Sequence, residues 1–318
     1  MRALVHSSLA QPPKRVAILL STYNGAQFLS DQLDSLLQQT FADWVLYWRD
    51  DGSTDETAAM MQRFMAGPGA GRCHAVTSPP GRLGPTGSFM ALLRVAVLAE
   101  ADVGAVAFAD QDDVWLPAKL ELAVAALRPD PRPTLYCSRQ ILVDQALHRI
   151  GLSATPRRPL QFPAALTQNV ATGCTVVLNP AAARLVAGSH PPAATLHDWW
   201  SYLVVSANGG RLVADDTPTV LYRQHGGNVV GAPASMRRRA VAALRRGPSV
   251  FMNVLRCHVA ALRDHPDLLS PDAAAALDVV EAGLQGGLAQ RLAALKRCTL
   301  SRQTWQETLL FRCWFLVG

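Results

Sequence analysis

A regular alternation of short apolar runs with longer amphipathic segments fills about the first 130 residues and constrains the fold more than any other feature. The runs are rich in branched apolar residues and have the length of buried strands, at 16–21, 44–48, 72–77 and 103–109. The segments that follow them carry apolar residues at helical spacing, at 27–39, 55–65, 86–99 and 117–127. This order predicts an α/β fold with a mostly parallel sheet that helices cover on both faces.

Beyond residue 130 the order of elements changes. Four further strands are expected, at 135–143, 171–178, 211–214 and 219–223. A proline- and arginine-rich loop at 155–163 separates the first two, and a helix is expected at 196–207. From residue 234 onward the spacing predicts helices. Their breaks are expected at prolines and at a glycine pair: Pro248, 266–271 and Gly286-Gly287.

The composition allows a large core and favours a reducing compartment. Of the 318 residues 49% are hydrophobic, which suits one large domain or two. The six cysteines are widely spaced and form no C-x-x-C pair, so we expect free thiols rather than a zinc site or a disulfide framework. Residues 1–15 lack the apolar core of a signal peptide, and no stretch reaches the roughly 18 apolar residues of a spanning helix. A soluble or peripheral cytoplasmic protein is expected.

Three carboxylates follow the fourth expected strand within four residues: Asp110, Asp112 and Asp113. They should emerge at the carboxyl end of that strand, which is the edge where ligands bind in open α/β sheets. Carboxylates this close repel one another unless a cation neutralises them or water screens them. Mg²⁺ and Mn²⁺ take oxygen ligands and often share them with substrate phosphates. The pattern therefore predicts a metal–diphosphate site; the alternative is a solvated acidic turn that caps the next helix.

Polar loops leave the first two expected strands at the same edge. Thr22, Tyr23 and Asn24 offer a hydroxyl, an aromatic face and a turn before a helix, whose N–H groups suit an anion or a nucleotide. A plain strand–helix turn would use similar residues. Asp50 and Asp51 follow the second strand. One of them can cap the next helix while the other accepts hydrogen bonds from a base or a ribose; the alternative is a double cap.

A small glycine-rich loop at 81–88, which contains Gly84, precedes the third expected helix and lets a ligand approach the backbone closely. It is not a P-loop, because the Gly-Lys-[Ser/Thr] ending is missing. A dinucleotide fingerprint is also excluded, because G-x-G-x-x-G does not follow the first strand. The loop therefore indicates a ligand contact without naming the ligand.

Two more groups of polar residues lie in the second half. His197 and Asp198 begin a helix beside two indoles, and Arg223 and His225 close a strand before a glycine pair. A lone histidine is more often a surface or satisfied residue than a metal ligand. A histidine at a strand end beside an acidic metal site is the exception, because imidazole is a common metal ligand.

In their order, these motifs resemble those of the inverting glycosyltransferases of family 2, which have the Rossmann-like GT-A fold. The matching strings are Ser21-Thr22-Tyr23-Asn24, Asp50-Asp51-Gly52-Ser53-Thr54-Asp55 and Asp110-Gln111-Asp112-Asp113. The longer strings at 109–117, 197–200 and 222–228 look most like the bacterial rhamnosyltransferase branch. The resemblance covers about 14–235, so it implies a GT-A domain there and a helical C-terminal extension at 236–318.

The resemblance implies a role for each matching residue. The donor nucleotide would be held by the early loops and the first acidic residue: Thr22, Tyr23, Asn24, Asp51, Gly84 and Asp110. Asp51 would read the pyrimidine base, and Asp110 would hold the ribose or the metal shell. Asp112 and His225 would bind Mg²⁺ or Mn²⁺, and Asp198 stands where the family places its catalytic base. Two further residues would support the site: Asp113 and Arg223.

The chain departs from the family pattern beside the base, where many members have Glu-Asp and this chain has His197-Asp198. The processive polymerase signature Gln-x-x-Arg-Trp is absent, because Gln224 is followed by His225-Gly226-Gly227. This implies transfer of a single sugar. The favoured donor is dTDP-L-rhamnose and the favoured acceptor is a polysaccharide, such as an O-antigen, or a lipid-linked glycan. A UDP-sugar donor is the alternative.

Other classes of function fit less well. A non-catalytic nucleotide-sugar-binding or scaffold protein would not need Asp112, Asp198 and His225 together. A nucleotidyltransferase would want a glycine-rich loop with a basic residue after the first strand, and 21–25 has no basic residue. Nucleic acid is not an expected partner, because the basic clusters lack interleaved aromatic residues.

The last third of the chain is basic and ends in an aromatic segment. Basic residues cluster at 237–239, 245–246 and 296–297, which suggests contact with an anionic surface. The segment 305–317 is apolar and aromatic but too short to span a bilayer. A helix of this kind suits the head-group interface, so peripheral contact with the inner face of the cytoplasmic membrane is expected. The alternative is that it packs on the protein itself or on a second subunit; the oligomeric state stays open.

Overall fold

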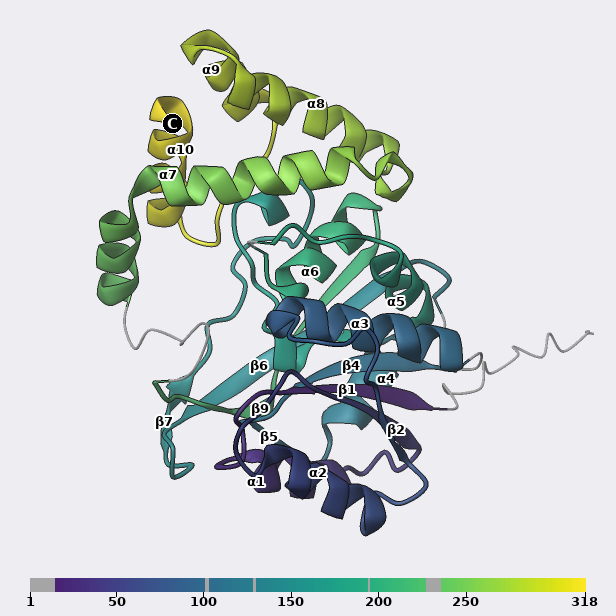
Figure 1. Ribbon diagram of the computed structural model, residues 1–318. Coiled ribbons are helices and arrows are strands. Elements are labelled where there is room, and N and C mark those ends of the chain that lie inside the picture. The colour runs from purple at the N-terminus through teal and green to yellow at the C-terminus, as the bar shows by residue number, and fades with distance from the viewer. Residues whose placement is uncertain (1–14, 101–102, 128–129, 194, 227–235) are drawn as a thin grey trace, which may run out of the picture.

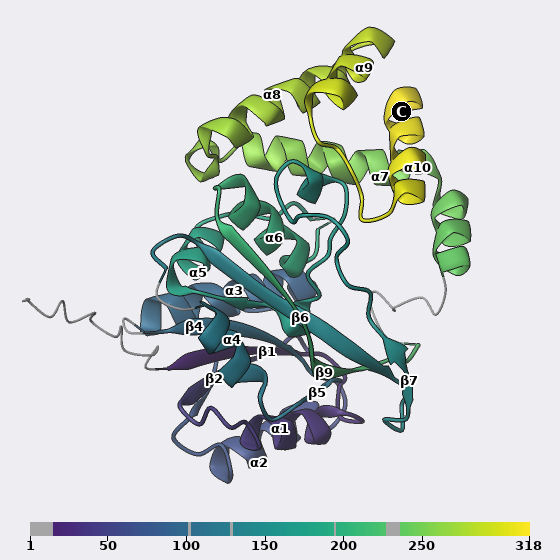
Figure 2. The same cartoon turned by 180° about the vertical axis from the view of Figure 1, so that it is seen from behind.

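The computed structural model describes residues 15–100, 103–127, 130–193, 195–226 and 236–318. Figures 1 and 2 show a central sheet between two groups of helices, with a further layer of helices from the last part of the chain at one end. This arrangement confirms the α/β class, the helices on both faces and the helical C-terminal region.

The first half has the expected alternation of strands and helices. Its elements are β1 (Val16–Thr22), α1 (Leu29–Leu37), β2 (Trp44–Asp50), α2 (Thr57–Ala66), β3 (Cys73–Ala75), α3 (Gly84–Ala99), β4 (Ala105–Asp110), β5 (Val114–Trp115) and α4 (Lys119–Leu127). The second half of the sheet region has β6 (Thr134–Val143), β7 (Arg149–Leu152), β8 (Val177–Leu178), α5 (Pro180–Ala187), α6 (His197–Ala207) and β9 (Arg211–Arg223). Two short 3-10 helices lie within it, η1 (Ala164–Leu166) and η2 (Gly173–Thr175).

Within the described residues, nine strands form one sheet in the order β3-β2-β1-β4-β8-β6-β9-β5, with β7 paired to β6. The strands β3, β2, β1 and β4 are parallel. The long pair of β6 and β9 is also parallel, whereas the short strands β5, β7 and β8 join their neighbours antiparallel. The sheet is therefore parallel in its long ladders and mixed at its short strands.

Apolar cores on both faces explain why the strand sequences are continuously hydrophobic. In β1, Ala17 and Leu19 join the core under α3, α5 and α6, whereas Val16, Ile18 and Leu20 join the core under α1, α2 and α4. The same division runs along β4. Strands with two buried faces leave their functional groups to the loops at their ends.

Three of the expected strands are wrong in detail. The segment 171–178 forms η2 and the two-residue β8, because the amides of Thr175 and Val176 turn back to the carbonyls of Thr172 and Gly173. The expected pair at 211–214 and 219–223 is the single strand β9, whose register with β6 shifts near Pro218. The hairpin strand β7 was not expected, because its residues are mostly exposed and lack a clear apolar pattern.

The C-terminal helices share one core with the sheet region. They are α7 (Met236–Arg263), the 3-10 helix η3 (Pro266–Leu268), α8 (Pro271–Gln285), α9 (Leu288–Arg297) and α10 (Trp305–Val317). The expected break near Pro248 is a kink at Gly247 in α7. Leu255 on α7 and Phe311 on α10 belong to the same apolar cluster as Leu203 on α6. In the described part of the chain, no helix combines the length and the apolar character needed to cross a membrane.

Candidate active site

The loops after β1, β2 and β4 meet at one edge of the sheet, as the parallel order requires. The register places Thr22 beside Asp50 and Ser21 beside Asp110. Thr22 is buried; its hydroxyl donates to Asp50 Oδ1 (3.0 Å) and accepts from Trp48 Nε1 (2.9 Å). Thr22 therefore supports the loop after β2 from within.

Side chains fasten these loops to one another. Gln111 Oε1 accepts from the amide of Tyr23 (2.8 Å) and Gln111 Nε2 donates to its carbonyl (3.0 Å), which copies the pairing of a strand. Gly25 leaves room for this side chain, because a Cβ there would lie 2.1 Å from Gln111 Oε1. Asn24, with a positive φ of 46°, accepts from the amide of Thr54 through Oδ1 (2.8 Å). Sequence reasoning gave Gln111 no role.

The two carboxylates after β2 have different partners. Asp50 accepts from the amides of Gly52 (3.2 Å) and Ser53 (2.8 Å), so it closes its own turn. Asp51 is buried and accepts from the amides of Leu83 (2.6 Å) and Gly84 (2.8 Å). Asp51 also accepts from the hydroxyl of Ser88 (3.0 Å). Gly84 has a φ of +70°, which favours glycine, so Asp51 holds the glycine-rich loop at the start of α3.

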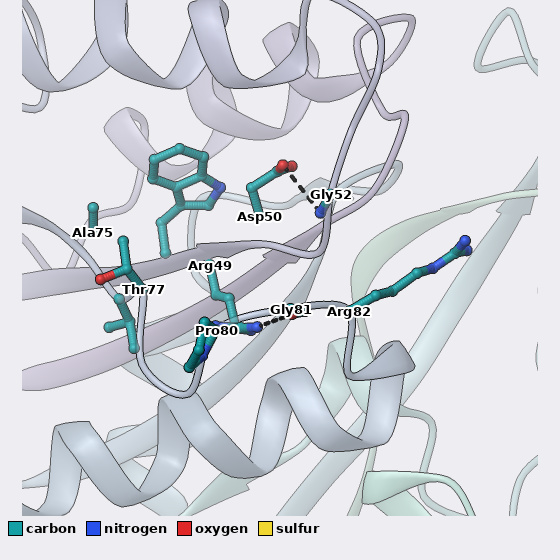
Figure 3. Close-up of a pocket in the computed structure, with 10 residues that line it drawn as sticks. Arg49, Asp50, Gly52, Ala75, Thr77, Pro80, Gly81 and Arg82 are labelled. Atoms are coloured by element: carbon teal, nitrogen blue, oxygen red, sulfur yellow. Dashed lines mark hydrogen bonds between the residues drawn. The ribbon is translucent and has the colours of Figure 1, made fainter.

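A pocket of about 370 Å³ opens beside Asp50 (Figure 3). The end of β2, the end of β3 and the loop at 80–82 line it. Arg49, one of the lining residues, is buried and donates to the carbonyl of Gly81 (2.6 Å). Arg82 stacks on the exposed ring of Tyr23 at 3.9 Å. The volume lies in the usual range for small-ligand sites.

The acidic turn after β4 is fixed by β9. His225 Nε2 lies 2.8 Å from Asp112 Oδ2, so the structure brings the two expected metal ligands together. Arg223 is buried: its amide donates to Asp113 Oδ1 (3.1 Å) and its Nε donates to the carbonyl of Asp112 (2.9 Å). A further nitrogen of Arg223 pairs with Asp31 at the start of α1 (2.7 Å). Arg223 therefore ties the acidic turn to β9 and α1.

Burial and neighbouring carboxylates disfavour the charge of Asp110 and Asp113 in this turn. Burial, then the charges of Asp112 and Asp198, raise the pKa of Asp110 to about 8. Burial and the charges of Asp112 and Asp110 also raise the pKa of Asp113 well above its usual range. Asp110 at the end of β4 therefore lies close enough to Asp198 on α6 for their charges to interact. A cation at this place would relieve the repulsion.

A second group of ligand atoms lies beneath the turn. One oxygen of Asp110, one of Asp113 and the sulfur of Cys174 lie within 4.8 Å of one another. Burial raises the pKa of the Cys174 thiol well above its usual range, so a hard cation would not find a thiolate there. Lys119 is also buried nearby, with its Nζ 4.2 Å from the centre of the Trp115 ring. Sequence reasoning missed Cys174 and Lys119, because the apolar run and the helix start hide them.

Asp198 lies at the first turn of α6 and is held by backbone amides. Its Oδ2 accepts from Gly173 (3.0 Å) and its Oδ1 from Trp199 (2.6 Å), and the nearby side chain of Asn169 helps to lower its pKa. Burial nevertheless raises the pKa of Asp198 to about 6. A carboxyl group with a pKa near neutrality is suited to proton transfer.

His197 is buried in an apolar setting. Its ring stacks on Phe89 (centroids 3.9 Å apart) and meets Phe108 edge-on at 4.8 Å. Among the described residues neither ring nitrogen has a hydrogen-bond partner. Burial lowers the pKa of His197 to about 3, so the ring is neutral.

Comparisons with known proteins identify the family. The family described as "Glycosyl transferase family 2" matches residues 17–175, which is half of the chain. Together with the α/β fold and the acidic site, this places the chain in glycosyltransferase family 2. It is an enzyme of glycosyl transfer.

Relatives and solved structures agree with this assignment. The chain is 27% identical to the dTDP-rhamnosyl transferase RfbG of Shigella flexneri over 69% of this chain and 76% of that protein. It is 28% identical to the UDP-Glc:alpha-D-GlcNAc-diphosphoundecaprenol beta-1,3-glucosyltransferase WfgD of Escherichia coli, over 52% of this chain and 60% of that protein. The crystal structure of S. aureus TarS 1–349 in complex with UDP-GlcNAc has the same fold, with a TM-score of 0.58 and 15% identity over 88% of this chain and 73% of that chain.

Gly173 generates a test of this geometry. Its amide holds Asp198, and an added Cβ would lie 2.8 Å from His197 Nε2 and 3.7 Å from Asp110 Oδ2. We expect Gly173→Ala to displace His197 and lower kcat for glycosyl transfer by about tenfold or more, because small displacements of reacting groups are costly. Steady-state kinetics and thermal unfolding measure the two effects. Gly151→Ala, where a Cβ meets nothing within 4 Å, is the control and should match the wild type. Equal kcat in both variants would contradict the expected role of Gly173.

Proposed function

We propose that the protein moves a single sugar from a nucleotide-sugar to a polysaccharide or lipid-linked glycan, with inversion at the anomeric carbon and with a divalent metal. One observation carries the proposal: Asp112 and His225 are in contact (2.8 Å) beside Asp110, whose pKa is raised by burial and by the charges of Asp112 and Asp198. The candidate metal ligands Asp112 and His225 and the carboxyl group of Asp198, whose pKa is also raised, therefore belong to one site. This is what displacement of a diphosphate by an acceptor hydroxyl requires.

dTDP-L-rhamnose is the favoured donor. The support is the similarity to RfbG, named a dTDP-rhamnosyl transferase, over 69% of this chain. WfgD carries UDP-Glc in its name and the TarS structure holds UDP-GlcNAc, so a UDP-sugar is the second candidate. The pocket beside Asp50 is the proposed place for the nucleoside, with the Arg82–Tyr23 stack next to it.

The residues of the acidic turn fit a divalent cation. Asp112 offers a carboxylate oxygen and His225 an imidazole nitrogen, and burial and the charges of Asp112 and Asp198 oppose the ionisation of Asp110 without a cation. When bound, Mg²⁺ or Mn²⁺ would neutralise charge on the leaving diphosphate. Asp110 would complete the metal shell or hold the ribose. Asp113 and Arg223 would keep the turn in place through the hydrogen bonds that Arg223 donates to Asp113 and to the carbonyl of Asp112.

The proposed chemistry uses one residue for proton transfer. Asp198 takes the proton of the acceptor hydroxyl as that oxygen forms a bond to the anomeric carbon and the bond to the nucleoside diphosphate breaks. The amides of Gly173 and Trp199 hold Asp198 in the orientation for this step. A single displacement inverts the anomeric carbon, and no covalent intermediate with the enzyme is needed.

A donor screen tests the function. The protein is incubated with Mn²⁺ or Mg²⁺, a lipid-linked glycan as acceptor and a panel of dTDP- and UDP-sugars, and released nucleoside diphosphate is measured. We expect dTDP-L-rhamnose to give the fastest release. Asp112→Asn should reduce it by about 10²-fold or more, because a charge is lost where leaving-group charge develops. Asp216→Asn, an exposed carboxylate on β9, is the control and should match the wild type. Near-normal release by Asp112→Asn would contradict the metal assignment.

The pKa of Asp198 sets an expected pH dependence. A general base works when it is deprotonated, and the pKa of Asp198 is raised to about 6, so kcat should be high above this pH and fall as pH drops through it. An aspartate of ordinary pKa would keep its activity down to about pH 4. Measurement of kcat at saturating donor, with circular dichroism as a check on folding, gives the profile. Asp198→Asn should lose roughly 10²-fold in kcat and lack this acidic limb.

We infer that α10 also contacts the inner face of the cytoplasmic membrane, where a lipid-linked acceptor would lie. One face of the helix, with Phe311 and Phe315, is buried in the protein core, whereas Trp305 is 66% exposed and Leu309 is 55% exposed. Arg312 is exposed on the same helix. An apolar stripe beside a basic residue suits a head-group interface. The basic residues at 237–239 and 245–246 belong to α7, but their side chains lie outside the described part of the structure.

Co-sedimentation with anionic vesicles tests this contact. We expect the protein to bind vesicles that contain phosphatidylserine at low salt and to dissociate as salt screens the attraction. Leu309→Ser should weaken binding by several-fold, since apolar area is lost from the interface. Ile150→Ser, which changes an equally exposed residue on β7, is the matched control and should bind normally. Failure of the wild-type protein to sediment at low salt would mean that α10 is a packing element only.

A further inference from the structure

The segment 164–169 lies between the candidate base and the C-terminal helices. On one side it contacts the base and its neighbour. The carbonyl of Ala165 accepts from Trp199 Nε1 (2.9 Å), and the side chain of Asn169 lies near enough to Asp198 to lower its pKa. This segment therefore forms one wall of the place where Asp198 sits.

The other side of the same segment is held by residues that precede α10. The hydroxyl of Thr167 donates to the carbonyl of Ser301 (2.8 Å), and Arg302 Nη1 donates to the carbonyl of Thr167 (3.0 Å). The amide of Gln303 donates to Gln168 Oε1 (2.9 Å). Residues 165 and 169 thus face Asp198 and Trp199, whereas residues 167 and 168, which lie between them in the sequence, contact the segment that precedes α10. In Figures 1 and 2 the loop before α10 runs from the helical layer toward the loops beside α6.

A second contact from the C-terminal helices reaches the same place. His258 on α7 is buried, and its Nε2 lies 2.7 Å from the hydroxyl of Thr195, just before α6. Its ring meets Trp199 edge-on, with centroids 4.6 Å apart. Trp199 is therefore held between α7 and Ala165, next to Asp198. Two separate parts of the C-terminal region pack around the residues that border the candidate base.

We propose that the segment 301–303, which we call the clamp, is a positioning element for Asp198. The clamp acts through Thr167 and Gln168 on Asn169 and Trp199. The inference rests on the proposed function, because it takes Asp198 as the base. The physical reason is that 164–169 has only one short 3-10 turn of its own and needs outside partners for its polar groups. A base displaced by about 1 Å from the acceptor hydroxyl can lose about 10²-fold in rate.

Variants of Gln168 test the clamp. Gln168→Met removes the acceptor for the Gln303 amide while keeping the side-chain length, and we expect kcat to fall about fivefold or more with donor KM within about twofold. Gln168→Glu keeps an acceptor oxygen and should restore most of kcat. Gln161→Met makes the same change at an exposed position of the same loop and is the matched control. Wild-type kcat in Gln168→Met would overturn the proposal.

Coupling to Asn169 separates positioning from a general loss of stability. If the clamp acts through Asn169, Gln168→Met should cost little further kcat in an Asn169→Ala background. The same fold loss in both backgrounds would overturn the proposal.

A readout without turnover makes the two proposals distinguishable. The indole N–H resonance of Trp199, assigned with Trp199→Phe, should shift in Gln168→Met and not in Gln161→Met, because Ala165 accepts from this group. An unmoved resonance would overturn the clamp. A shifted resonance in a protein that releases nucleoside diphosphate from no donor would retain the clamp and refute the proposed function.

Discussion

The crowding of carboxylates at the carboxyl end of β4 is the constraint on which the rest of the structure depends. Asp110, Asp112 and Asp113 fall within four residues, and Asp198 approaches them from α6. Burial raises the pKa of Asp110, Asp113 and Asp198, and the charges of neighbouring carboxylates raise that of Asp110 and Asp113 further. Hydrogen bonds from the surrounding elements hold these carboxylates in place. Arg223 on β9 fixes the acidic turn, and amides of η2 and α6 hold Asp198. A site arranged in this way is built to receive positive charge.

The sequence was sufficient for the first half of the fold because the signals there are local. Strands with two buried faces give continuous apolar runs, and helices give a periodic pattern, so each element of the α/β half could be predicted from its own residues. The meeting of Asp51, Asp110 and the loop after β1 at one edge followed from the parallel order. Contacts between residues far apart in the sequence leave no local pattern from which they could be predicted. Gln111 pairs with Tyr23 across 88 positions, and Gly173 was assigned to a strand although its turn holds Asp198.

The C-terminal helices are more than a cover for the sheet region. Their buried residues belong to the same apolar cluster as α3, α5 and α6, and their loop and α7 both reach the residues that border Asp198. The final helix shows why a pattern alone could not decide between packing and membrane contact. Phe311 and Phe315 turn inward, so one face of the helix packs on the protein, while Trp305 and Leu309 on the exposed face are the residues proposed to meet the membrane.

The bonds of Asp51 have a consequence for the arrival of the donor. Both carboxylate oxygens accept hydrogen bonds from residues at the start of α3: Leu83, which caps the helix, Gly84 and Ser88. The carboxylate is also buried, so a nucleobase that donates to one of these oxygens competes with that turn for it. Recognition of the base and loosening of the glycine-rich loop would then be a single equilibrium, and the measured affinity would be lower than the intrinsic one by the fraction of molecules with the loop released. Ligands that bind too weakly to displace the hydrogen bonds of Asp51 would then be excluded.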